Sequence, residues 1–139
     1  MKRILLDSSV WAAFFDSADR HHADTKRLLE TTARGQRFAA LDLTLYELSN
    51  VAITTWGSSA DAMLLLSLVQ HTCPEAIVRM DERLYELTVE LAEQHRLTAY
   101  DAAYVAAARL NDWTLVSGDH RDLVTPGHAI DPGAALALG

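Results

Sequence analysis

Short apolar runs that end at acidic or turn residues alternate with helical segments along this chain, and this alternation limits the fold more than any other feature. The first run is Ile4-Leu5-Leu6 and a late one is Leu115-Val116. Runs this short and this apolar are typical of strands that are buried on both faces. Strands that alternate with helices predict a parallel sheet covered by helices on both sides. We therefore expect an α/β fold.

The expected elements follow the chain in order. Strands are expected over residues 2–6, 37–41, 76–79 and 114–116, with 128–130 as a further candidate. A short helix should follow Asp7, with Ser8 or Ser9 as its N-cap. Longer helices are expected over 19–34, closed by Gly35, and from Thr44 to Gly57, from Ser58 or Ser59 to Pro74, over 81–95, and after a cap at Thr98.

Length and composition favour a single domain over residues 1–139. Half of the residues are apolar and 22% are charged, which is ordinary for a globular protein and argues against disorder. Cys73 is the sole cysteine, so no intramolecular disulfide can form, as a reducing cytoplasm permits. The apolar start is too short for a signal peptide and later apolar runs are too short for a bilayer span. The expected location is the cytoplasm, with no membrane partner.

The net charge of −7 argues against a protein that binds nucleic acid by charge alone. It argues less against a nuclease, because carboxylates that hold divalent metals contribute to the deficit. Basic residues gather in one stretch, which we interpret first as a solvated helix face. They are Arg20, Lys26, Arg27, Arg34 and Arg37.

Four acids are the strongest candidates for chemistry. Asp7 and Asp119 directly follow expected strands, and in open α/β sheets reactive groups gather at the carboxyl ends of the strands. Gly118 would let the backbone turn tightly before Asp119. Glu47 and Asp101 lie near the starts of apolar helices, where the helix dipole favours a carboxylate. Each acid taken singly is more often structural, for example as a helix cap, but four from separate segments can converge on one site.

Clustered carboxylates resist joint ionisation unless a cation lies among them. Ligation by oxygen alone suits Mg²⁺ or Mn²⁺, which retain water and accept phosphate oxygens. Such a site can activate water for attack on a phosphodiester.

The segments around these acids resemble the four motifs of the PIN-domain family, specifically its VapC-type toxins. The matching segments occur in the family's order: ILLDSSVW (4–11), TLYELSNV (44–51), LTAYDAAYVA (97–106) and LVSGDHRDL (115–123). Each motif alone is weak, but the ordered set spans nearly the whole chain and is specific.

The resemblance implies a three-layer α/β/α fold whose central parallel sheet has about four to five strands. It also implies an endoribonuclease that depends on Mg²⁺ or Mn²⁺ and leaves 5′-phosphate and 3′-hydroxyl ends on RNA. A homodimer and a cognate antitoxin protein are the implied partners, and the apolar helices of residues 44–72 are candidates for the antitoxin groove.

Residue roles are carried over by position. Asp7, Asp101 and Asp119 would bind metal, and Glu47 would complete the site and orient the attacking water. Ser9 would hydrogen-bond near the metal, and Ser117 stands where the family often has Thr or Ser. Two further residues are open at this point: Asp122 would serve a second metal or cap a turn, and Arg121 would meet a phosphate or form a surface ion pair.

Other candidates favour structural roles. No Cys or His spacing resembles a zinc site, so His21 and His22 are expected to be structural or solvated. The aromatic residues are expected in the core or an interface rather than as platforms for bases: Trp11, Phe14, Phe15, Tyr46 and Trp56. Two other functions remain open, a protein-binding module without catalysis and another phosphohydrolase. A haloacid-dehalogenase-like phosphatase would need a second Asp where Ser9 stands.

Overall fold

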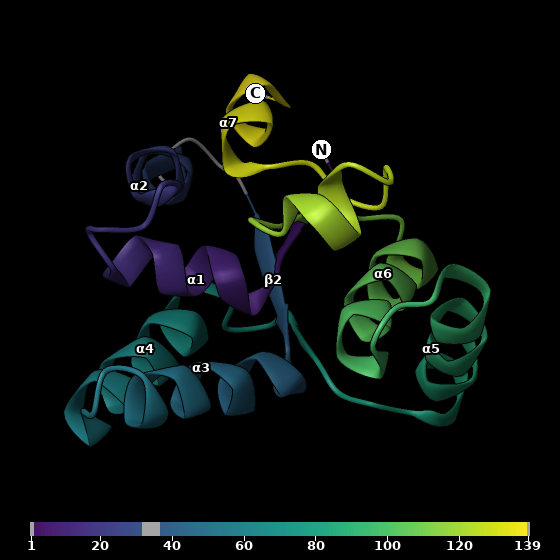
Figure 1. Cartoon of the computed structure of the whole chain (residues 1–139), viewed down its shortest axis with the longest axis horizontal. Helices are drawn as coiled ribbons and strands as arrows, with labels where there is room; N and C mark the ends of the chain where they lie inside the picture. The colour runs from purple at the N-terminus through teal and green to yellow at the C-terminus, as the bar shows by residue number, and fades with distance from the viewer. Residues whose placement is uncertain (1, 32–36, 139) are drawn as a thin grey trace.

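The computed structural model describes residues 2–31 and 37–138, which build a parallel β-sheet with helices on both faces (Figure 1). In these residues the strands are β1 (Ile4–Leu6), β2 (Phe38–Leu41), β3 (Ile77–Val78) and β4 (Thr114–Val116). Their spatial order is β3-β2-β1-β4. Central β1 pairs with β2 through Ile4 and Phe38 and with β4 through Leu6 and Val116. The expected α/β fold is confirmed.

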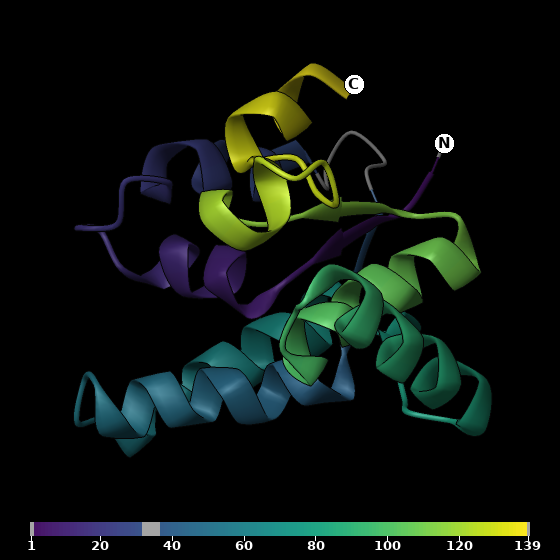
Figure 2. The ribbon, with the colours of Figure 1, turned by 45° about the vertical axis from the view of Figure 1, so that its right-hand side comes forward.

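Helices connect the strands and form the outer layers. They are α1 (Ser8–Phe15), α2 (His22–Glu30), α3 (Asp42–Thr54), α4 (Ser59–Thr72), α5 (Glu82–His95), α6 (Ala99–Asn111), the π-helical turn η2 (His120–Val124), α7 (Pro132–Ala135) and the 3₁₀ turn η3 (Leu136–Leu138). Figure 2 shows α3 to α6 on one side of the sheet, with α2, η2 and α7 on the other. Helices α3 and α4 pack as a pair, and so do α5 and α6.

The core explains why the strands are so apolar. Every residue of β1 and β2 is buried, because helices cover both faces of the sheet. Helix α6 presents Ala102, Ala106 and Ala107 with no exposed surface, so its backbone lies close to its neighbours. None of the helices in the described residues has the length and apolar character that a bilayer span requires.

Several expected helix starts are confirmed and two are wrong. Ser58 caps α4, and Thr98 caps α6 by accepting a hydrogen bond from Asp101 N at 3.1 Å. The N-cap of α1 is Asp7 rather than a serine, because its carboxylate accepts from Val10 N. Helix α3 begins at Asp42, two residues before the expected cap. Thr44 lies inside the first turn and accepts from Leu41 N at 3.1 Å.

The expected fifth strand and one expected helix are shorter than predicted. Residues 128–130 form only an isolated parallel bridge, between Ile130 and Val116 at the outer edge of β4. The helix expected over 19–34 covers His22–Glu30, and its expected closing residue Gly35 lies outside the described residues. Helices α5 and α6 both end at non-glycine residues in the left-handed conformation, Arg96 and Asp112, which no turn signal in the sequence predicts.

Candidate active site

Two of the four predicted acids extend from the carboxyl ends of neighbouring strands. Asp7 follows β1 and Asp119 lies three residues beyond the end of β4, and these strands pair in parallel register. Both acids also cap the helix that follows. Asp7 Oδ1 accepts from Val10 N at 3.3 Å, and Asp119 Oδ1 accepts from Asp122 N at 3.1 Å. Asp7 and Asp119 therefore each cap a helix and also lie at the edge of the sheet where a site is expected.

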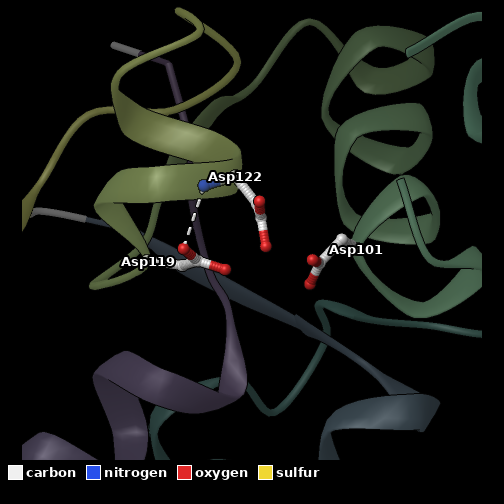
Figure 3. A group of neighbouring side chains, drawn as sticks. All are labelled: Asp101, Asp119 and Asp122. Atoms are coloured by element: carbon white, nitrogen blue, oxygen red, sulfur yellow. Dashed lines mark hydrogen bonds between the residues drawn. The ribbon is translucent and has the colours of Figure 1, made fainter. Parts of the chain in front are cut away.

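Three carboxylates come close enough to share one cation. Asp101, Asp119 and Asp122 each offer an oxygen, and these oxygens lie within 4.8 Å of one another (Figure 3). Asp101 comes from the first turn of α6, and the other two come from the start of η2. Helix α6 and the segment after β4 are thus brought together by the fold. Asp122, which the sequence left open, belongs to this group.

Asp7 lies deeper than the group of three. It is 5% exposed, and burial raises the pKa of its carboxyl from 3.8 to about 6. Hydrogen bonds from Ser117 and Ser9 lower that pKa in part, and the negative charge of Asp101 raises it. Ser9 Oγ donates to Asp7 Oδ1 at 2.5 Å and accepts from Gly118 N at 2.9 Å. Both predicted serines therefore contact the deepest acid.

Glu47 lies in the second turn of α3, one turn further along than the sequence suggested. Its Oε1 accepts a hydrogen bond from the Tyr104 hydroxyl at 2.7 Å. Besides burial, the negative charge of Glu47 also raises the pKa of Asp101. The pKa of the Asp101 carboxyl is raised first by burial, and then by the charges of Asp119, Asp122 and Glu47. Asp101 therefore interacts electrostatically with each of the other four acids.

The donor set fits a hard divalent cation. The group of three consists of carboxylates alone, and a cation would offset both the burial and the mutual repulsion that raise the Asp101 pKa. Oxygen donors without His or Cys suit Mg²⁺ or Mn²⁺ better than zinc. All three residues are half-exposed, so water and a phosphate can reach them.

Gly118 lies in a tightly packed part of the site. A Cβ at this position would lie 3.1 Å from His21 Cδ2 and 3.3 Å from Ser9 Oγ. These contacts are tighter than ordinary van der Waals contacts, so His21 and Ser9 would have to move by a few tenths of an ångström to admit a larger residue. His21 in turn stacks on His120, with ring centroids 5.5 Å apart, and His22 Nδ1 contacts Ala13 O at 2.8 Å. Both neighbouring histidines pack within the fold.

The remaining candidates separate into surface and core. Arg121 is exposed and pairs with Asp122, its Nε lying 3.2 Å from Asp122 Oδ1. The basic residues on and around α2 that the structure describes, Arg20, Lys26, Arg27 and Arg37, are exposed, and Arg34 lies outside the described residues. Trp11 is fully buried and Phe15 stacks on Trp56. Tyr46 lies outside the core, since it is 78% exposed, so only the interface part of its expected role remains open.

Sequence reasoning missed the two hydroxyl groups that surround Glu47. Tyr104 lies three residues after Asp101 on α6, and Thr44 lies three residues before Glu47 on α3. Residues three apart share a helix face, so this spacing was the available signal. It could not show that the two faces meet.

Known proteins share this arrangement of a parallel sheet and helices. Fold and site define a class, α/β proteins whose carboxylates gather beyond the carboxyl ends of a parallel sheet. A family model of the PIN domain matches residues 4–125. This chain belongs to the PIN domain family.

Solved structures with the same fold include three that cover nearly all of the chain. A toxin–antitoxin complex from Klebsiella pneumoniae is 22% identical with a TM-score of 0.68, covering 93% of this chain and 97% of that one. PAE2754 from Pyrobaculum aerophilum is 23% identical with a TM-score of 0.72, covering 98% and 88%. VapC20 from Mycobacterium tuberculosis, described as a toxin that cleaves the sarcin–ricin loop, is 19% identical with a TM-score of 0.73, covering 89% and 95%. No curated protein matches the sequence closely enough to add to this comparison.

Proposed function

We propose that this chain, acting as one domain over residues 1–139, is a metal-dependent endoribonuclease and the toxin of a toxin–antitoxin pair. The observation that carries the proposal is the group formed by Asp101, Asp119 and Asp122, with Asp7 and Glu47 beside it. Membership of the PIN domain family supports nuclease chemistry at this place in the fold. The toxins among the similar structures support the biological role.

The acidic residues would hold Mg²⁺ or Mn²⁺. Asp101, Asp119 and Asp122 are the nearest ligands, Asp7 lies behind them, and Glu47 completes the set. A divalent cation at such a site activates water and neutralises charge on the phosphate. Glu47 would orient the attacking water. Ser9 and Ser117 hold the Asp7 carboxylate in place, and Arg121, on the exposed side, is free to turn from Asp122 toward an RNA phosphate.

Cleavage of total RNA by the purified protein tests this proposal. We expect fragments with Mg²⁺ or Mn²⁺ and none with EDTA. Asp101→Asn should lower the cleavage rate at least about 100-fold while the protein stays folded, because it removes a charge that the metal needs. Glu93→Gln is the matched control, since Glu93 is exposed on α5 and its loss changes net charge equally.

Two results would contradict the assignment. Wild-type rates in Asp101→Asn would remove Asp101 from the site. No cleavage by folded wild-type protein with either metal would favour the alternative, a protein-binding module without catalysis.

A second copy of the chain is the first proposed partner. Exposed apolar side chains of α3, α5, α6 and the segment before α5 surround a cavity of about 340 Å³. They are Tyr46, Met80, Tyr85, Val89 and Tyr100, which we call the tyrosine face. Among the described residues that line the cavity, Asp42 alone is charged. Two copies of a chain with net charge −7 can meet on this face with few opposed carboxylates.

An antitoxin protein is the second proposed partner, and the cytoplasm is the proposed location because RNA is the proposed substrate. Helices α3 and α4 expose Ile53, Met63 and Leu64, which a partner's apolar segment could cover. Expression of a toxin should arrest bacterial growth, and co-expression with its antitoxin should relieve that arrest and yield a complex. Persistent arrest with no complex would contradict this pairing.

A further inference from the structure

A chain of hydrogen bonds inside the protein ends at Glu47. Leu41 N donates to Thr44 Oγ1 at 3.1 Å, and Thr44 Oγ1 lies 2.8 Å from the Tyr104 hydroxyl. The Tyr104 hydroxyl then donates to Glu47 Oε1 at 2.7 Å. Thr44 and Glu47 belong to α3, and Tyr104 belongs to α6, 57 positions later than Glu47. The bonds therefore join two helices through one carboxylate.

The direction of every bond in this chain is fixed by the charge on Glu47. An ionised carboxylate only accepts, so the single hydroxyl proton of Tyr104 must point to Glu47. Thr44 must then donate to the Tyr104 oxygen, and it is free to do so because it accepts from Leu41 N. Each donor polarises the next, which strengthens the last bond in the series. A backbone N–H at the start of α3 thus supports the acid in its second turn.

The two residues that carry the hydroxyl groups of this series are buried. Thr44 is 0% exposed and Tyr104 is 2% exposed. Burial and the neighbouring charge of Glu47 raise the pKa of the Tyr104 phenol well above 10, so it remains a donor throughout the physiological range. Within the part of the chain that the structure describes, the second oxygen of Glu47, Oε2, accepts no protein hydrogen bond and is free for another ligand.

We propose that Tyr104, supported by Thr44, is a positioning residue: its hydroxyl holds Glu47 Oε1 so that Oε2 serves the cation and water of the acidic site. This inference rests on the proposed function, and it adds a residue that touches neither metal nor RNA. Tyr104 is suited to the task because it lies on the same face of α6 as Asp101, one turn away. One face of α6 thus supplies a ligand and also orients a carboxylate from α3.

A double-mutant cycle with Mn²⁺ alone tests the inference apart from catalysis. The dissociation constant for Mn²⁺ is measured by electron paramagnetic resonance for the wild type, Tyr104→Phe, Glu47→Gln and the double variant. Tyr104→Phe should weaken Mn²⁺ binding about 10-fold or more in the wild-type background. It should have little further effect after Glu47→Gln, since no carboxylate is left to position. A purely structural role would give the same loss in both backgrounds.

Two further measurements use matched controls. In RNA cleavage, Tyr104→Phe should lower kcat about 10- to 100-fold with KM unchanged, because the hydroxyl makes no substrate contact. Thr44→Val should weaken Mn²⁺ binding in the same direction but less. Thr88→Val is its control, because Thr88 is also buried but its hydroxyl donates only to Leu84 O within α5. Tyr85→Phe controls for the loss of a phenol on the surface.

The outcomes separate this inference from the proposed function. Equal Mn²⁺ affinity in the wild type and in folded Tyr104→Phe would overturn the positioning role, and so would equal losses in both backgrounds. A wild type that binds Mn²⁺ with the expected coupling but cleaves no RNA would overturn the nuclease and leave the positioning role intact. A wild type that binds no Mn²⁺ would overturn both.

Discussion

At the scale of single residues, Asp7 is needed as a charged ligand in the proposed site, but its buried charge lowers the stability of the fold. Its carboxyl takes up a proton at about pH 6 in the folded chain but near 3.8 when exposed. Between these values the folded state binds more protons than the unfolded state, so the free energy of unfolding falls as pH rises from about 4 to about 6. It then stays low. The shift of about two pKa units corresponds to about 3 kcal/mol, which a bound cation would offset.

Asp7→Asn should therefore stabilise the metal-free protein above the pKa of Asp7. At about pH 7.5 we expect a higher free energy of unfolding, with about 3 kcal/mol as the upper limit, and near pH 4 we expect almost no difference. Urea unfolding in EDTA, repeated between about pH 4 and about pH 7.5, measures this difference in the free energy of unfolding. The exposed control Glu93→Gln should leave the pH profile unchanged. Parallel curves for Asp7→Asn and the wild type would show that burial of this charge is not destabilising.

At the scale of elements, α6 combines a rigid apolar face with an acidic start. Ala102, Ala106 and Ala107 are fully buried, and Asp101 is held in the first turn by the cap at Thr98. Small side chains let this helix approach its neighbours closely, and that approach decides where Asp101 stands relative to η2. Helix α6 thus packs against the core through its alanines and also holds Asp101 in the acidic site.

Ala106→Leu should disturb stability and site together. The added side chain has no space, so we expect a loss of about 1–3 kcal/mol in the free energy of unfolding and weaker Mn²⁺ binding as Asp101 shifts. Ala60→Leu is the control, because Ala60 is exposed in the first turn of α4, and its effect should stay within about 0.5 kcal/mol. Denaturant unfolding and Mn²⁺ titration measure the two effects. Equal stability of both variants would contradict close packing at α6.

At the scale of the whole molecule, the tyrosine face is the surface on which we propose that a second copy docks. Tyr85→Arg places a charge among the exposed tyrosines, and we expect it to shift the protein from dimer to monomer in sedimentation experiments. Tyr85→Phe keeps the apolar surface and should remain dimeric. A wild type that is monomeric at all concentrations would remove the proposed second copy from this face.

Much of the fold could be predicted because its signals are local. The runs at Ile4 and Leu115, the caps at Ser58 and Thr98, and the position of Asp7 after a strand all follow from neighbouring residues. The ends of α5 and α6 at Arg96 and Asp112 could not be predicted, because neither residue is the glycine that usually marks a left-handed helix end. The strand expected over 128–130 was reduced to one bridge at a sheet edge.

The sequence by itself determined the alternation of strands and helices, and with it the edge of the sheet to which Asp7 and Asp119 belong. Only the tertiary structure decided which side chains meet there. It joins Asp122 to Asp101 and Asp119, places Tyr104 on Glu47 across 57 positions, and brings Gly118 against Ser9 across 109. Contacts between residues so far apart in the sequence depend on how the helices and the segment after β4 pack against the sheet, and no local pattern of residues encodes that packing.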